Sequence, residues 1–186
     1  MPDTRRLDHR AADSAHRLPA IIGAVHETQG PEEQNSTDLA MMRRALLAAR
    51  TAAEKGEVPV GAVVAREGEI LAVAANERES TKDPTAHAEL LAIRQAAASL
   101  GGWRLTGCTL YSTLEPCPMC AGAAHAARLD RLGYAAPDPK AGHAGTLHNI
   151  PADRSLNHPV TVEKGVLEAE AAELLRAFFR DRRREA

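Results

Sequence analysis

Two short motifs place metal-binding side chains at the starts of two separate helices, and this limits the folds open to the chain. Cys117 and Cys120 lie three positions apart in the stretch E-P-C-P-M-C, so both thiols can face one ion from a single helical turn. Proline is favoured in the first turn of a helix, so Pro118 places the two cysteines at a helix N-terminus. The free N–H groups and the helix dipole there lower the pKa of a thiol toward the thiolate that a metal requires.

The second motif, P-T-A-H-A-E, carries His87 and Glu89. Positions i and i+2 are about 200° apart around a regular helix, so the two side chains cannot share one helical face. Both can still reach a site that lies off the end of the helix, and Pro84-Thr85 marks a helix start just ahead of His87. The sequence therefore predicts two helices that direct their N-termini at one ion.

The number of protein ligands bears on the kind of metal site. One histidine and two cysteines make three ligands, which is typical of a catalytic zinc whose fourth position holds water. Glu89 is then available as the proton carrier beside that water. Two alternatives remain: no metal at all, or a structural zinc closed by a fourth ligand from Cys108, His125, His143 or His148. Cys108, at the start of an expected buried strand, is better interpreted as a small core residue.

Composition sets the broad class of protein. With 186 residues and 44% apolar content, the chain suits one domain plus a tail. The net charge of −2 gives no global signature of nucleic-acid binding, so any such binding has to be local. Three cysteines indicate reduced thiols or metal ligands rather than a disulfide framework, which favours the cytoplasm. No apolar stretch approaches the roughly 20 residues that cross a bilayer, so we expect no membrane association.

Residues 1–36 are polar and lack a period of 2 or 3.6, so we expect a disordered N-terminal extension, with the folded domain spanning 37–186. Thr37 or Asp38 is expected to cap a first helix that ends at Gly56. Further helices are expected at 86–99, 118–128 and 166–184, and strands at 60–65, 70–75, 109–113, 131–135 and 160–162. The first two strands form a hairpin. Strands interleaved with helices predict an α/β sheet covered by helices on both faces.

The H-x-E motif of residues 87–89 and the distant P-C-x-x-C of 116–120 form the zinc deaminase signature. V-P-V-G-A at 58–62, D-P-K-A-G at 138–142 and L-N-H at 156–158 add to the likeness. From about residue 38 to 184, the chain resembles the bacterial tRNA-specific adenosine deaminase family, within the zinc-dependent cytidine and deoxycytidylate deaminase superfamily.

The resemblance implies a cytidine-deaminase-like three-layer α/β/α sandwich with a mixed central sheet of about five strands. It implies hydrolytic deamination of adenosine to inosine at the wobble position of a tRNA anticodon, by a homodimer with one zinc ion per subunit. His87, Cys117 and Cys120 carry over as zinc ligands, and Glu89 carries over as the general acid and base. Contacts to the base and RNA are expected from Asn76, Ala88, Glu115, Pro116, Asp138, Lys140, Asn157, His158, Phe179 and Arg180.

The last helix bears on the substrate. Arg176, Phe179, Arg180 and Arg183 follow i, i+3, i+4, i+7 spacing on one face, which suits unstacked bases and phosphates. Periodicity alone equally allows a solvated helix end whose arginines complement the dipole; the resemblance favours RNA. Two departures from the family pattern, Pro159 and 135–137, affect the expected RNA contacts and not the zinc chemistry.

Two other functions remain open. A deaminase of free guanine, cytosine or a nucleoside would share the zinc site but would not need the basic and aromatic last helix. A non-catalytic zinc-stabilised RNA-binding subunit would not need Glu89.

Overall fold

The structure, a computed structural model, describes residues 31–185. Helix α1 (Pro31–Glu54) begins ahead of Thr37, because proline is favoured at the first position of a helix. Residues 31–36, assigned from the sequence to the N-terminal extension, thus form the first turns of α1. Residues 1–30 lie outside the described residues, and the disordered extension stays a prediction. Gly56 adopts a left-handed φ of 79° just past the helix end, as expected of a C-terminal cap.

The expected hairpin follows α1. Strand β1 (Gly61–Arg66) pairs antiparallel with β2 (Glu69–Ala75), so two residues connect them. Glu67 and Gly68 both have positive φ, which is the requirement of the two-residue turn that matches strand twist.

The sheet is mixed and has five strands in the order β2-β1-β3-β4-β5. β1 lies antiparallel to β3 (Cys108–Leu114), whereas β4 (Arg131–Ala136) and β5 (Thr161–Lys164) continue the sheet in parallel with β3. The carboxyl ends of β3 and β4 therefore meet at one edge of the sheet.

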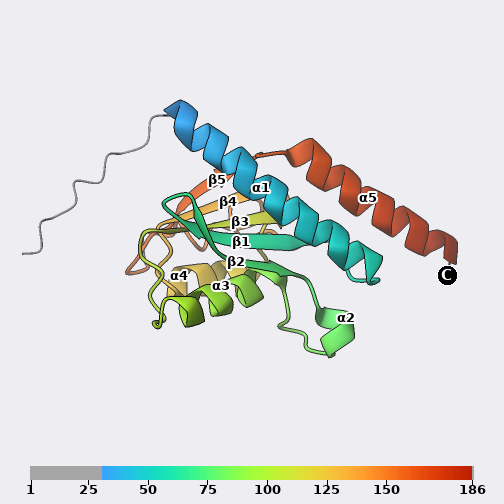
Figure 1. Ribbon diagram of the computed structural model, residues 1–186, viewed down its shortest axis with the longest axis horizontal. Helices are drawn as coiled ribbons and strands as arrows, with labels where there is room; N and C mark the ends of the chain where they lie inside the picture. Colours follow the sequence, from blue (N-terminus) through green and yellow to red (C-terminus); the bar gives the residue numbers. More distant parts are fainter. Residues whose placement is uncertain (1–30, 186) are drawn as a thin grey trace, which may run out of the picture.

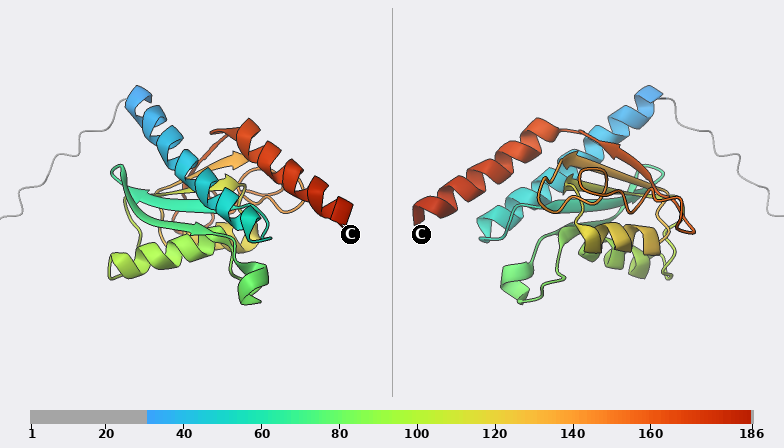
Figure 2. Two further views of the ribbon diagram at one scale, coloured as in Figure 1. Left: turned by 45° about the vertical axis from the view of Figure 1, so that its right-hand side comes forward. Right: turned by 180° about the vertical axis from the view of Figure 1, so that it is seen from behind.

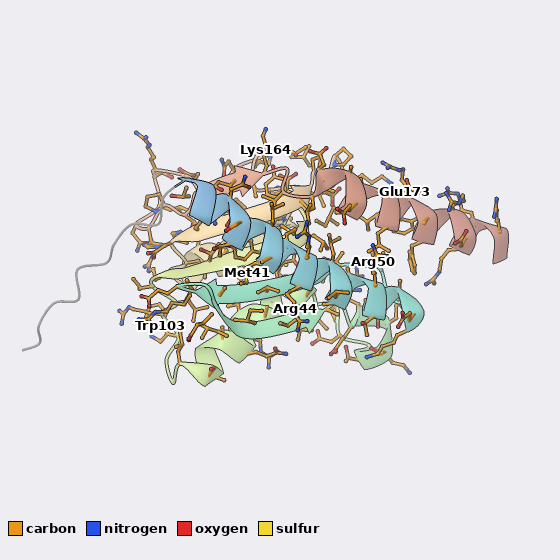
Figure 3. The ribbon with its side chains drawn as sticks, turned by 45° about the horizontal axis from the view of Figure 1, so that its top comes forward. Met41, Arg44, Arg50, Trp103, Lys164 and Glu173 are labelled. Carbon is orange, nitrogen blue, oxygen red and sulfur yellow. The ribbon has the colours of Figure 1, made fainter. Side chains whose placement is uncertain are left out.

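Helices cover both faces of this sheet, which confirms the three-layer α/β/α sandwich (Figure 1). α3 (Ala88–Ser99) and α4 (Pro118–Ala126) pack on one face, as the two views of Figure 2 show. α1 and α5 (Glu168–Glu185) lie side by side on the other face, with Met41 on α1 and Glu173 on α5 in Figure 3. A short helix, α2 (Arg78–Thr81), follows β2. Within residues 31–185, no helix combines the length and apolarity needed to span a membrane.

Small residues let the layers approach closely. A Cβ added to Gly61 on β1 would collide with the carbonyl oxygen of Ala45 and lie 2.7 Å from the nitrogen of Ala49, so α1 rests directly on the strand. Asp38, expected as a helix cap, is instead buried inside α1, where it pairs with Arg131 of β4. Asp38 does not cap the helix because α1 begins seven positions earlier, at Pro31.

Candidate active site

Two helix N-termini meet at one group of metal-binding side chains. His87 is the N-cap residue of α3 and has an extended backbone with ψ of 146°, so it precedes the helix and is not part of it. This explains how residues at i and i+2 face one site, because Glu89 lies in the first turn while His87 lies off the helix end. Cys117 is the N-cap of α4, with Pro118 at the start of that helix.

The three proposed ligands converge at distances that suit zinc. Nδ1 of His87 lies 3.7 Å from Sγ of Cys117 and 3.5 Å from Sγ of Cys120. Bond lengths of about 2.3 Å to sulfur and 2.05 Å to nitrogen around a tetrahedral zinc give an N···S separation of about 3.6 Å. The donor set and its spacing therefore fit a zinc ion that keeps one open position.

None of the four candidate fourth ligands joins this group, the only such group among residues 31–185. Nδ1 of His125 lies 2.8 Å from the carbonyl oxygen of His158, and Nδ1 of His143 lies 2.9 Å from that of Ala141. The ring of His148 packs against His143, with centroids 4.9 Å apart. Cys108 is fully buried in the core at the start of β3, as its interpretation as a core residue predicted.

Charge is unevenly shared within the group. The hydrogen bond between the two thiols lowers the pKa of Cys117 to about 4 and raises the pKa of Cys120. A hydrogen bond from the protonated ring of His87 to the Cys117 sulfur also raises the pKa of His87. A thiolate is thus present at neutral pH, ready to bind a cation.

Glu89 is buried, with 3% of its surface exposed, and burial raises its pKa to about 7. The charges of His87 and Cys117 also act on its carboxyl group, which places it beside the proposed ligands. A carboxyl group that titrates near neutrality can both accept and return a proton.

The proposed ligands open into a pocket of about 950 Å³ at the carboxyl ends of β3 and β4. The pocket brings together nine of the residues predicted as zinc ligands, as the general acid and base, or as contacts to the base and RNA: Asn76, His87, Glu89, Glu115, Cys117, Asp138, Lys140, Phe179 and Arg180. The last two extend from α5, so part of the pocket wall comes from the far end of the chain.

Four predicted substrate contacts do not line the pocket. Ala88 and Pro116 are buried beside it. Asn157 and His158 lie near the carboxyl end of α4, away from the metal group at its amino end. There the side chain of Asn157 accepts a hydrogen bond from Arg128, and Nε2 of His158 lies 2.9 Å from the carbonyl oxygen of Leu129.

Glu115 and Asp138 shape the pocket wall. The buried carboxylate of Glu115 accepts hydrogen bonds from the backbone nitrogens of Asp138, Ala144 and Thr146 at 2.9 to 3.1 Å, and from the Thr146 hydroxyl. The side chain of Asp138 in turn accepts a hydrogen bond from the backbone nitrogen of Lys140 at 2.9 Å. These hydrogen bonds indicate that the two acids hold the pocket wall in place and do not direct a free oxygen at a ligand.

Two residues near the pocket were missed in the sequence. Arg78 lines the pocket from α2, a helix too short to leave a periodic pattern. Glu57 is buried behind Asn76 and bonded to its amide. An acid in the turn before Val58-Pro59 was the available signal for Glu57.

Comparison with known proteins identifies the family of this chain. Residues 35–136 match the family described as the cytidine and deoxycytidylate deaminase zinc-binding region. The chain belongs to this deaminase family. It is therefore a zinc-dependent deaminase, and the group of His87, Cys117 and Cys120 has the composition and spacing to hold its zinc.

Particular deaminases are also similar to this chain. The tRNA-specific adenosine deaminase of Bacillus subtilis is 50% identical over 143 residues, which cover 77% of this chain and 89% of that protein. A solved structure from a study of A-to-I editing by tRNA:A34 deaminases is 43% identical, with a TM-score of 0.70, and covers 73% of this chain and 99% of that one. A guanine deaminase structure from Bacillus subtilis is 41% identical, with a TM-score of 0.52, and covers 57% and 69%.

Proposed function

We propose that the protein hydrolyses adenosine to inosine at the wobble position of a tRNA anticodon, releasing ammonia. The relatives named for this activity support the reaction and the substrate. The observation that carries the proposal is one pocket lined both by the metal group and by an aromatic and basic wall.

The wall suits an unstacked nucleotide. Phe179 is 44% exposed, and its ring packs edge-on against Phe178 with centroids 5.4 Å apart, which leaves its outer surface available for a base. Phosphates require cations, and five basic side chains line the same pocket: Arg78, Lys140, Arg176, Arg180 and Arg183.

Acidic neighbours do not cancel this positive charge. Glu173 pairs with Arg176 at 2.9 Å and approaches Arg180 at 3.9 Å, but all three side chains are at least half exposed. Ion pairs of this kind are weak in water and are readily exchanged for phosphate contacts.

The reacting groups divide the chemistry. His87, Cys117 and Cys120 hold zinc, which when bound supplies an activated water at neutral pH. Glu89 takes one proton from the attacking water and passes it to a ring nitrogen of adenine as the water oxygen bonds to C6. It then moves the second proton of that oxygen to the amine, which leaves as ammonia when the bond between C6 and the amine nitrogen breaks. Asn76 contacts the base from the end of β2.

The proposal extends to the assembly and its setting. By resemblance to the family, the protein is a cytoplasmic homodimer with one zinc per subunit, and it binds the anticodon stem-loop. Asn157 and His158, away from the pocket, remain predicted contacts to RNA outside the wobble nucleotide. Sedimentation of the protein with and without the stem-loop tests both the dimer and the complex.

One experiment separates this function from its alternatives. The protein is incubated with an anticodon stem-loop carrying adenosine at the wobble position and, in parallel, with guanine, cytosine, adenosine and cytidine. We expect inosine from the stem-loop alone. The similarity to a guanine deaminase makes the free base the second candidate, and ammonia released from guanine without inosine would establish it. Binding of the stem-loop without release of ammonia from any substrate would instead favour a non-catalytic subunit.

A further inference from the structure

The turn between α1 and β1 holds a buried carboxylate next to the pocket. Glu57 is only 1% exposed, and its two oxygens accept three hydrogen bonds. The donors are Nδ2 of Asn76 at 3.1 Å and the backbone nitrogens of Glu79 at 3.1 Å and Ser80 at 2.7 Å. Burial raises the pKa of Glu57, but the two backbone donors, the Ser80 hydroxyl and the charge of Arg78 together outweigh it, and the pKa lies below its ordinary value. Glu57 is therefore ionised at neutral pH.

An ionised carboxylate fixes the orientation of the Asn76 side chain. Because a carboxylate only accepts hydrogen bonds, the amide nitrogen has to face Glu57. The amide oxygen lies on the other side of the side chain, away from Glu57, and Asn76 lines the pocket. The backbone nitrogen of Asn76 donates to the carbonyl oxygen of Val60 at 2.9 Å, which holds the main chain as well.

The same carboxylate holds α2. The two nitrogens that it binds belong to the first turn of this helix, which begins with Arg78. Arg78 is one of the basic residues lining the pocket. A third contact reaches the turn from α5, because Nη1 of Arg182 donates to the carbonyl oxygen of Gly56 at 2.9 Å.

We propose that Glu57 is a positioning residue for the deaminase reaction, which orients the amide of Asn76 toward the base and anchors the helix that carries Arg78. This inference rests on the proposed function, because it assumes that Asn76 contacts the base. Glu57 itself touches no substrate. Its removal should therefore act through Asn76 on kcat and through α2 on KM.

Glu57→Gln tests the proposal on the zinc-loaded protein with the stem-loop substrate. Glutamine keeps the shape but presents one acceptor oxygen instead of two, so the amide of Asn76 loses its fixed orientation or α2 loses its anchor. We expect kcat/KM to fall about 10- to 100-fold, the scale of a small misplacement of a substrate-positioning group. Glu54→Gln, the same change at an exposed glutamate of the preceding helix, is the matched control and should leave kcat/KM unchanged.

A double-mutant cycle distinguishes positioning from a general loss of structure. In an Asn76→Ala background, Glu57→Gln has no amide left to orient, so kcat should change by less than about threefold. An equal fall in kcat with and without Asn76 would overturn the proposal, as would an effect of Glu57→Gln no larger than that of Glu54→Gln.

A second pair of variants decides the matter if Glu57→Gln alone does not fold. Asn76→Asp sets two carboxylates against each other and should abolish most activity. Adding Glu57→Gln returns an amide opposite a carboxylate, so the double variant should regain part of kcat. No recovery would count against the proposal.

Failure of the proposed function gives a different pattern. Wild-type protein that forms no inosine from the stem-loop refutes that function, and the same variants are then compared on whichever free base or nucleoside the wild type deaminates. Inosine formed by wild type and by Glu57→Gln at equal rates refutes only the positioning role.

Discussion

Asp38 of α1 and Arg131, the first residue of β4, form a two-bond ion pair on the face of the sheet that α1 covers. Nη1 of Arg131 lies 2.8 Å from one carboxylate oxygen of Asp38, and Nη2 contacts the other. The hydroxyl of Tyr111 donates to the same carboxylate at 2.7 Å. Only 6% of the Asp38 side chain and 13% of the Arg131 side chain are exposed, so the pair is largely desolvated.

Asp38→Asn should destabilise the fold, because it leaves the guanidinium of Arg131 buried without its main countercharge. We expect a loss of about 3 kcal/mol in the free energy of unfolding, the scale for breaking a buried ion pair. Arg131 also pairs with Glu163, which is 46% exposed, so Glu163→Gln should cost less than about 1 kcal/mol. Urea titration followed by circular dichroism measures both, and equal losses would show that burial does not determine the strength of the two pairs.

Glu89→Gln should abolish turnover while the protein keeps its zinc. Glutamine fills the same buried space but cannot accept and return a proton, so kcat should fall by at least about 10²-fold. Glu89 lies outside the group of proposed ligands, so one zinc per chain should remain by elemental analysis. Cys120→Ser is the contrasting variant and should lose zinc and activity together. Loss of zinc from Glu89→Gln would instead place its carboxylate among the ligands.

The carboxylate of Glu115 should make stability depend on pH in the acid range. Burial raises the pKa of Glu115, but hydrogen bonds from the hydroxyl and backbone of Thr146 and from other backbone nitrogens outweigh it, and the folded-state pKa lies below 4.5. A carboxyl group with a lowered folded-state pKa contributes its full stability above pH 4.5 and loses it as the pH falls through the folded-state value.

Glu115→Gln removes that contribution, so the variant should be less stable than wild type at pH 7. The difference should narrow as the pH falls below 4.5, because the wild-type carboxylate is then protonated as well. Unfolding by urea at a series of pH values measures the difference. A constant gap across the series would assign the loss to packing and not to ionisation.

Arg180→Ala should weaken binding of the stem-loop and reduce the slope of log affinity against log salt by about one phosphate contact. Arg184 lies on the same helix, is 75% exposed and is absent from the pocket lining, so Arg184→Ala is the control and should keep the slope. Fluorescence anisotropy at several salt concentrations gives both values. An unchanged slope for Arg180→Ala would make the α5 face an ordinary solvated surface.

Much of the fold was predictable because its periodic signals are local. Strands expected at 70–75 and 109–113 appear as Glu69–Ala75 and Cys108–Leu114, and the glycine that ends α1 lies where the sequence places it. The start of α1 was not predictable from polar composition, since proline at position 31 begins the helix inside a stretch that lacks apolar periodicity.

The pocket divides in the same way. His87, Cys117 and Cys120 could be predicted as zinc ligands because two short motifs carry all three side chains and each is of a type that binds zinc. Arg78 and Glu57 could not, because their places in the site depend on where a four-residue helix packs and on hydrogen bonds between segments distant in the chain. Substrate contacts on loops such as 157–158 likewise depend on packing that leaves no mark on local sequence.

The separation between the metal group and α5 has an evolutionary consequence. The proposed zinc ligands and Glu89 stand at the starts of α3 and α4, whereas Phe179 and Arg180 belong to the last helix of the chain. Mutations on the pocket side of α5 can therefore change substrate binding while the metal group and Glu89 keep their positions. Within such a fold, a lineage can inherit its chemistry intact and still acquire a new substrate by changing one helix.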